Sequence, residues 1–231
     1  MPDDTTEYTQ RPFTPPPGAS QLLLVRHGAS APYRVGEDFA LVDGHGDPPL
    51  DPIGHHQAER VAERLAGEQI AAIYVTSLQR TVQTAEPLAS RLGIEPIVES
   101  DLREVLLGEW EGGAFRKHVA EGHPIAMQMM AEQRWDVIPG AESSEVFTAR
   151  IVGAVERIAA RHVDEFVVVF THGAVIAQLL AFATGARRFS FISDNASISH
   201  LIAHEGRWFV RRYNDTTHLH AGFTTAPEPM T

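Results

Sequence analysis

The feature that most constrains the fold is an alternation of short apolar runs with longer segments of helical periodicity. Residues 22–25, 70–75 and 166–170 are apolar, as expected of buried strands. Helices are predicted at residues 54–67, 78–92, 113–133, 143–162 and 174–183, with a short further strand at 94–98. Strands that alternate with helices pair in parallel and are covered on both faces. The pattern predicts an α/β chain, folded as a three-layer α/β/α sandwich around a mainly parallel central sheet.

Two segments near the C-terminus differ from the rest because they alternate apolar and polar residues. Residues 197–203 and 208–212 are joined through Glu205-Gly206 and predict an antiparallel pair, which adds one antiparallel strand to the sheet. Residues 1–20 are polar and proline-rich, and we expect a disordered N-terminal tail there. The remaining residues, 21–231, have the length of one α/β domain.

The composition argues against several classes of function. The formal net charge is −11, whereas nucleic acids and anionic membranes are bound by clustered Lys and Arg, so neither is expected as a partner. The chain has no cysteine, which removes disulfides, thiolate catalysis and cysteine-based zinc sites and fits a cytoplasmic protein. No apolar run reaches membrane-spanning length. No cofactor or metal is expected, and the oligomeric state stays open, with a homo-oligomer among the alternatives.

Two of the predicted parallel strands end on histidine and glycine. Residues 22–25 lead into Arg26-His27-Gly28, and residues 166–170 lead into Thr171-His172-Gly173. The carboxyl ends of parallel strands meet at one edge of a sheet, where open α/β folds bind ligands. A neutral histidine can attack phosphorus through a ring nitrogen lone pair, and arginine offers phosphate a permanently charged fork. The sequence therefore predicts a phosphate-handling site at this edge.

Two further residues are expected at the same edge. Arg80 lies in the first turn of a predicted helix, where a cation opposes the helix dipole unless an anionic ligand offsets the cost. Glu104 follows the short strand at 94–98. A carboxyl group there can donate a proton to a leaving oxygen and then take one from water. The alternative for Glu104 is a solvated loop glutamate.

These residues belong to a longer ordered set of motifs. The set comprises Leu23-Leu24-Val25-Arg26-His27-Gly28, Asp47-Pro48-Pro49-Leu50-Asp51-Pro52-Ile53-Gly54, Thr76-Ser77-Leu78-Gln79-Arg80-Thr81, Leu102-Arg103-Glu104, Gly108-Glu109-Trp110-Glu111-Gly112, Pro139-Gly140-Ala141-Glu142-Ser143, Thr171-His172-Gly173 and Tyr213-Asn214-Asp215. Each motif alone is weak, but the order is specific. It resembles that of the histidine phosphatase superfamily, which includes the cofactor-dependent phosphoglycerate mutases.

The resemblance covers almost the whole chain after the tail, and it implies a mechanism as well as a fold. It implies a phosphohistidine mechanism on a three-layer α/β/α fold, with His27 phosphorylated and Glu104 as the proton donor. It also implies that Arg26, Arg80 and His172 bind the phosphoryl oxygens, together with backbone groups at Gly173.

The chain departs from the family pattern in ways that bear on function. Tyr33 stands six residues beyond His27, where many relatives carry an asparagine. Ala141 replaces a glycine in the motif of residues 139–143. After Gly113 the chain lacks the Arg-His-Tyr-Gly and Glu-Arg-Arg-Tyr segments with which mutases hold a second phosphate. A phosphatase is favoured over a mutase, and Tyr33 keeps open a third alternative, a non-catalytic phospholigand-binding module.

Two segments are expected to set substrate selectivity. These are the long connection at 29–52 and a lid-like insertion at about 113–133. Tyr33, Arg116 and Lys117 are the candidate residues, although Lys117 could equally be a solvated helix lysine. They suit a small phosphorylated metabolite with an organic part beside the phosphate, and a second anionic group is one option.

Overall fold

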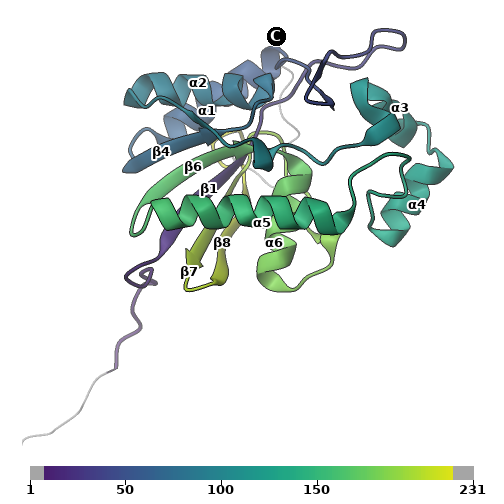
Figure 1. Ribbon diagram of the computed structural model, residues 1–231. Helices are drawn as coiled ribbons and strands as arrows, with labels where there is room; N and C mark the ends of the chain where they lie inside the picture. Colours follow the sequence, from purple (N-terminus) through teal and green to yellow (C-terminus); the bar gives the residue numbers. More distant parts are fainter. Residues whose placement is uncertain (1–7, 221–231) are drawn as a thin grey trace, which may run out of the picture.

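The computed structural model describes residues 8–220, and within them it contains the predicted sheet. The six strands are ordered β5-β4-β6-β1-β7-β8 (Figure 1). β7 runs antiparallel to both β1 and β8, and the other neighbouring pairs are parallel, so the mainly parallel sheet with one antiparallel strand is confirmed. The strands are β1 (Ser20–Arg26), β4 (Ile70–Val75), β5 (Ile97–Val98), β6 (Phe166–Thr171), β7 (Ile198–His204) and β8 (Arg207–Asp215).

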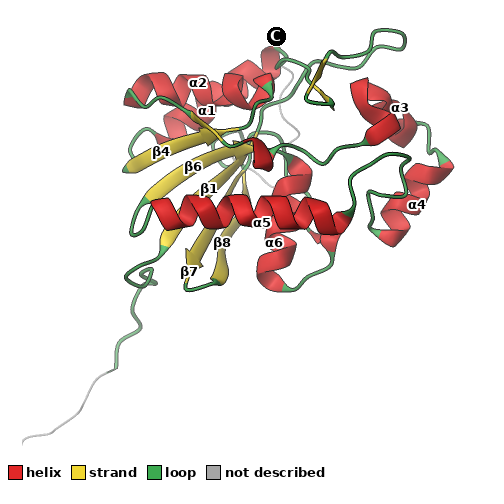
Figure 2. Ribbon diagram, viewed as in Figure 1, coloured by secondary structure: helices red, strands yellow, loops and turns green. Residues whose placement is uncertain are grey.

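Helices cover both faces of the sheet, which confirms the three layers (Figure 2). α1 and α2 pack on one face, and α5 and α6 pack on the other. The helices are α1 (Pro52–Leu65), α2 (Gln79–Leu92), α3 (Ala114–Ala120), α4 (Pro124–Glu132), α5 (Ser144–Arg161) and α6 (Gly173–Thr184), with 3₁₀ turns η1 (Ser100–Leu102), η2 (Gly108–Gly113) and η3 (Arg188–Ser190).

The central position of β1 explains why its sequence is continuously apolar. Leu22 and Leu24 contribute to the core on the side of α5 and α6, whereas Leu23 and Val25 contribute to the core on the side of α1 and α2. All four side chains are buried, because successive residues of a strand point to opposite faces of the sheet. β1 pairs in parallel with β6, so the residues that follow the two strands leave the sheet at the same edge.

The predicted N-terminal tail ends earlier than the sequence suggests. Ser20 already belongs to β1, and Ala19 is buried. The backbone N–H of Gly18 donates a hydrogen bond to Asp164 Oδ1 at 2.6 Å. Residues 18–20 are therefore part of the folded domain. Residues 1–7 of the predicted tail and residues 221–231 of the predicted domain lie outside the described residues.

The insertion at 113–133 is helical, as predicted, but it forms two short helices, α3 and α4. Gly122 interrupts them with a φ of 65°, and Pro124 starts the second helix. Both stand apart from the two main helical layers (Figure 1). They pack on a small separate core that includes Trp110 and Met129. The connection at 29–52 contains a short hairpin, β2 (Leu41–Val42) and β3 (His45–Gly46).

Candidate active site

The pairing of β1 with β6 brings the two predicted histidines together. Arg26 at the end of β1 lies opposite Thr171 at the end of β6, so His27 and His172 follow side by side. Their ring centroids are 5.3 Å apart, with an angle of 61° between the ring planes. A cavity of about 420 Å³ opens at this edge of the sheet.

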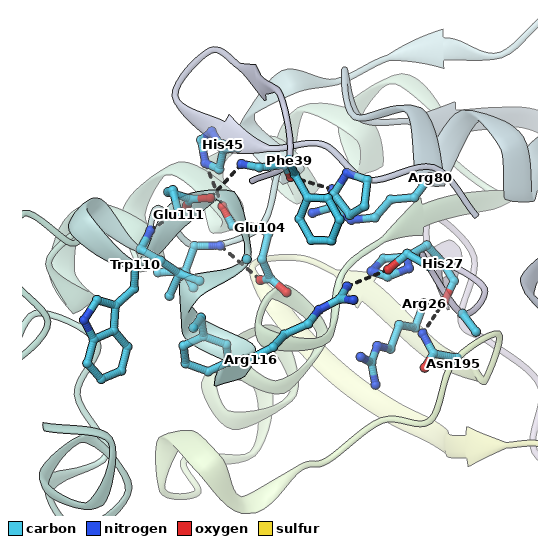
Figure 3. Close-up of a pocket in the computed structure, with 18 of the residues that line it drawn as sticks. Arg26, His27, Phe39, His45, Arg80, Glu104, Trp110, Glu111, Arg116 and Asn195 are labelled. Atoms are coloured by element: carbon cyan, nitrogen blue, oxygen red, sulfur yellow. Dashed lines mark hydrogen bonds between the residues drawn. The ribbon is translucent and has the colours of Figure 1, made fainter. Parts of the chain in front are cut away.

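Four of the predicted catalytic and phosphate-binding residues line this cavity, as Figure 3 shows. Arg26 and His27 come from the end of β1, and Arg80 comes from the first turn of α2. Glu104 follows η1 on the opposite side. The sheet edge therefore gathers a histidine, a carboxyl group and two guanidinium groups from three separate parts of the chain.

The backbone holds His27 in one orientation and one tautomer. Nδ1 lies 2.7 Å from the carbonyl oxygen of Gly28, so Nδ1 carries the ring proton and donates it. Asn195 Nδ2 donates to the carbonyl oxygen of His27 at 3.0 Å. Burial, followed by the charges of Arg80 and Arg26, lowers the pKa of His27 well below its ordinary value. The ring is therefore neutral, and the lone pair on Nε2 is available for nucleophilic attack.

His172 is completely buried beside His27. Its Nε2 lies 3.1 Å from Thr76 Oγ1. Its Nδ1 is buried and has no hydrogen-bond partner among residues 8–220. Burial and the charge of Arg80 lower the pKa of His172 well below its ordinary value, so this ring is also neutral. A buried polar atom of this kind requires a partner, and a ligand in the site can supply one.

Both predicted arginines are partly desolvated cations. Arg26 donates to the carbonyl oxygen of Ser193, and its Nε is buried with no hydrogen-bond partner in the described part of the chain. Arg80 lies 3.7 Å from the carboxylate of Asp47. Burial lowers the pKa of each arginine, and the charge of Glu104 opposes that shift. Both groups stay charged, because arginine titrates far above neutrality, and an anion would offset the cost of their burial.

The start of α6 connects Arg26 with the carboxyl group of Glu104. A Cβ atom at Gly173 would lie 3.3 Å from Arg26 Nε, so the glycine leaves room for the guanidinium beside the helix. Glu104 Oε2 accepts a hydrogen bond from the N–H of Ala174 at 3.3 Å, and Oε1 accepts one from the N–H of Val105 at 3.0 Å. Two backbone amides thus orient the Glu104 carboxyl group.

Three positioning residues were not identified from the sequence. Arg150 on α5 and His45 in the 29–52 connection both contact the carbonyl oxygen of Glu104, at 2.8 and 3.1 Å. Asn195 holds the backbone of His27 from the segment before β7. A charged residue bordering the apolar face of an amphipathic helix was the one signal available for Arg150. His45 and Asn195 carry no such signal, because only the tertiary structure brings them to the site.

Of the three candidates for selectivity, Arg116 is the one that lines the cavity. It reaches in from α3, and its guanidinium carbon lies 5.4 Å from the ring centroid of Phe39 (Figure 3). Tyr33 packs edge-on against Phe39 and donates a hydrogen bond to Asp38 at 3.1 Å. Tyr33 therefore contacts the lining residue Phe39 and does not itself line the cavity. Lys117 also lies outside the set of described residues that line this cavity.

Comparison with known proteins identifies the family. The profile described as histidine phosphatase superfamily (branch 1) matches residues 22–216. The chain belongs to this superfamily. The strand ends and the cavity described above are thus those of a superfamily member, and the resemblance inferred from the motif order is confirmed.

Individual relatives point to phosphatases and mutases. Phosphoglycerate mutase-like protein 4 of Arabidopsis thaliana is 33% identical over 205 residues, which cover 87% of each chain. Phosphoserine phosphatase 1 of Hydrogenobacter thermophilus is 32% identical over 203 residues, which cover 86% of this chain and 94% of that protein. A solved mycobacterial glucosyl-3-phosphoglycerate phosphatase is 29% identical, with a TM-score of 0.70, covering 86% of this chain and 100% of that one. Membership of this superfamily supports an enzyme of the phosphatase or mutase type.

None of the helices in residues 8–220 is long and apolar enough to span a bilayer. Over the same residues, no three or more His, Cys, Asp or Glu side chains are grouped so that they could hold a metal ion.

Proposed function

We propose that the protein is a phosphomonoester hydrolase that acts on a small phosphorylated metabolite, without a metal ion, through a phosphohistidine at His27. The observation that carries this proposal is the tautomer of His27. Its Nδ1 proton is held by Gly28, so the Nε2 lone pair is free in a cavity that also contains Arg26 and Arg80. The two arginines supply the positive charge that stabilises a phosphoryl group during transfer.

The first step transfers the phosphoryl group to the protein. The phosphate binds against Arg26, Arg80 and the buried Nδ1 of His172. The lone pair of His27 Nε2 then forms a bond to phosphorus while the bond from phosphorus to the ester oxygen breaks. The protonated carboxyl group of Glu104 donates its proton to that leaving oxygen, and an alcohol departs.

The second step returns the protein to its starting state. The carboxylate of Glu104 takes a proton from a water molecule, and the water oxygen forms a bond to phosphorus. The bond between phosphorus and His27 Nε2 breaks, which restores the neutral imidazole and releases inorganic phosphate. The two amides that hold the Glu104 carboxyl group keep it in place through both steps.

Hydrolysis is proposed ahead of mutase activity for two reasons. A mutase must hold a second phosphate, and the chain lacks the two segments that mutases use for this after Gly113. Phosphatase-named relatives, including a metal-independent phosphoserine phosphatase of Arabidopsis thaliana at 30% identity, also support hydrolysis. A coupled mutase assay primed with bisphosphoglycerate separates the two activities.

The decisive experiment measures hydrolysis of an aryl phosphate in the presence of a chelator. We expect activity in the native protein and a loss of at least about a thousandfold in His27→Ala. His55→Ala, which changes an exposed histidine on α1, is the matched control and should retain activity. Loss of activity on adding chelator would contradict metal independence.

Trapping of labelled phosphate tests the intermediate. Native protein quenched during turnover with alkaline detergent, in which the P–N bond of phosphohistidine survives, should retain label, and His27→Ala should retain none. Binding of phosphate without turnover or label would instead identify a non-catalytic phospholigand-binding module.

A further inference from the structure

Arg150 on α5 uses every donor of its guanidinium group. Its Nη1 donates to the carbonyl oxygens of Asp101 and Arg103, at 2.6 and 2.8 Å. Its Nη2 donates to the carbonyl oxygen of Glu104 at 2.8 Å. Nε and Nη2 also donate to the two carboxylate oxygens of Glu142, at 2.7 and 2.8 Å. An arginine side chain has five N–H donors, and these contacts account for all of them.

Glu142 fixes this guanidinium from the residue before Ser143, the N-cap of α5. The pair is bidentate, which restrains the plane of the guanidinium, and the side chains of Arg150 and Glu142 are only 19% and 10% exposed. Glu142 is also bound to the segment that Arg150 holds, because its N–H donates to the carbonyl oxygen of Leu106 at 2.9 Å. The charge of Arg150 is balanced by its partner, so its influence on the cavity is one of position.

The carboxyl group of Glu104 follows the backbone that Arg150 holds. Its Oε1 accepts a hydrogen bond from the N–H of the next residue, Val105, at 3.0 Å, so the side chain is folded against its own backbone. The carbonyl oxygen of Glu104 lies between Arg150 Nη2 and His45 Nε2, which is 3.1 Å away. A displacement of the backbone at residues 103–105 would therefore carry the carboxyl group with it.

Such a displacement would act on one part of the proposed reaction, the transfer of a proton to the leaving oxygen. In that step the proton passes from the Glu104 carboxyl group to the ester oxygen, while the phosphorus–oxygen bond breaks and His27 Nε2 bonds to phosphorus. The donor must lie within hydrogen-bond distance of the oxygen that it protonates. A misplacement of about 1 Å can cost on the order of 100-fold in rate. Substrates with a strongly basic leaving oxygen depend on this proton most.

We propose that Arg150, held by Glu142, is a positioning residue that sets the carboxyl group of Glu104 at the leaving oxygen. This role rests on the proposed phosphatase function. Its basis is a guanidinium with every donor engaged, three of its bonds to the segment that carries the proton donor, and a carboxyl group tied to that same backbone. Arg150 is not among the described residues that line the cavity, so it acts through Glu104 and not on the substrate.

The alternative is that Arg150 only fastens α5 to the rest of the domain, and Arg157 provides a matched control for it. Arg157 also lies on α5, and its Nη2 pairs with Glu99 at 2.9 Å and with the carboxylate of Asp101 at 2.6 Å. It therefore joins the same helix to the same part of the chain, but through carboxylate side chains. If fastening were all that mattered, equivalent changes at the two arginines would alter catalysis in the same way.

The experiment compares Arg150→Lys with Arg157→Lys, because each variant keeps its positive charge and loses the planar fork. The quantity measured is kcat/KM for an alkyl phosphate and for an aryl phosphate, which reports the steps up to phosphorylation of His27. We expect the alkyl-to-aryl ratio of kcat/KM to fall by about tenfold in Arg150→Lys. Arg157→Lys should leave the ratio unchanged.

Glu142→Gln provides a second variant, which leaves Arg150 in place but removes its charged partner. The alkyl-to-aryl ratio should fall in the same direction, by a smaller factor of about threefold. Circular dichroism reports whether each variant is folded. If Arg150→Lys does not fold, the ratio in Glu142→Gln decides, and an unchanged ratio there contradicts the proposal.

Repeating the comparison in a Glu104→Gln background separates positioning from stability. This background has no carboxyl proton to place, so Arg150→Lys should not lower the alkyl-to-aryl ratio further. A further fall in this background would overturn the proposal, because Arg150 would then act on another group. Equal losses for the two substrates in Arg150→Lys with Glu104 intact would also overturn it and would leave Arg150 only a fastening role.

Failure of the proposed function gives a different result. A native protein that hydrolyses neither ester contradicts the phosphatase proposal, and the positioning role falls with it. Hydrolysis of both esters, with the same ratio in the native protein and in Arg150→Lys, contradicts the positioning role alone.

Discussion

Single residues at the sheet edge show how burial and charge together keep a histidine reactive. His27 is buried among cations, so protonating it would add a further positive charge to a desolvated site. The bond from Nδ1 to Gly28 then decides which nitrogen carries the lone pair. The lowered pKa alone does not make Nε2 a nucleophile, because a neutral ring in the other tautomer would present an N–H proton to the phosphate. The hydrogen bond to Gly28 is therefore also required.

The lowered pKa of His27 predicts activity on the acid side of neutrality. The reactive form is the unprotonated ring, so a lower pKa keeps it populated at about pH 5 to 6, where an ordinary histidine is largely protonated. Removing a nearby positive charge in Arg80→Gln should raise the pKa of His27. The acid limb of kcat/KM for an aryl phosphate should therefore move to higher pH in this variant. The variant should also bind phosphate more weakly. An acid limb at the same pH in both proteins would contradict the electrostatic account.

Glu104→Gln should slow substrates according to their leaving groups. An alkoxide requires a proton when it departs, whereas an aryl oxide requires it much less. We expect kcat for an alkyl phosphate to fall by about 100-fold or more, with a clearly smaller loss for an aryl phosphate. Glu109→Gln, at an exposed neighbouring position, is the control. Equal losses for the two substrate types would assign Glu104 a structural role.

At the scale of elements, the loop that carries His27 is fixed by close packing against α1. A Cβ atom at Gly54 would lie 2.0 Å from the carbonyl oxygen of Ala29, and one at Gly28 would lie 2.6 Å from the carbonyl oxygen of Gly54. Two backbone segments therefore meet without side chains between them. The Asp51 cap on the N–H of Gly54, at 2.7 Å, holds the first turn of α1 in this position.

Gly54→Ala should therefore destabilise the domain. The added methyl group meets backbone rather than a flexible side chain, so α1 must shift, and we expect a loss of about 1–3 kcal/mol in the free energy of unfolding. Gly153→Ala is the matched control, because its Cβ would make only an ordinary 3.6 Å contact with Arg157 Nη1 on α5. That variant should be more stable by about 0.5–1 kcal/mol. Urea unfolding of the two variants distinguishes these outcomes, and a stable Gly54→Ala protein would show that the contact can relax.

For the whole molecule, a partly buried histidine makes stability depend on pH. His200 on β7 packs against Phe166, with ring centroids 5.3 Å apart. Burial, with Arg211 and Arg212 nearby, lowers the pKa of His200 to about 4. The unfolded chain binds a proton at higher pH than the folded chain does, so this contribution to stability is present above about pH 6.5 and is lost as the pH falls towards 4.

We expect the free energy of unfolding to decline as the pH is lowered from about 6.5 to 4. His200→Phe keeps an aromatic ring on the strand and removes the titrating group. The decline should be smaller in this variant by about 1–2 kcal/mol, a range that allows for the partial exposure of His200. Denaturant unfolding at several pH values measures the difference, and parallel curves for the two proteins would show that His200 does not contribute.

The sequence alone determined the layers and the edge at which the site lies. Periodicity is local, so strands such as residues 22–25 and 166–170 could be recognised without any contact information. A histidine that directly follows a parallel strand must lie at the carboxyl edge of the sheet, because parallel strands have their carboxyl ends at the same edge. This is why His27, His172, Arg80 and Glu104 were expected together before the structure brought them there.

Tertiary structure alone decided which residues hold and surround these groups. The division of residues 113–133 into α3 and α4 aims Arg116 at the cavity and leaves Lys117 outside the wall. His45 and Asn195 reach the site from distant segments through backbone carbonyl contacts, which leave no periodic trace in the sequence. Side-chain direction on a short helix and contacts between remote loops depend on packing of the whole domain, so no local pattern of residues encodes them.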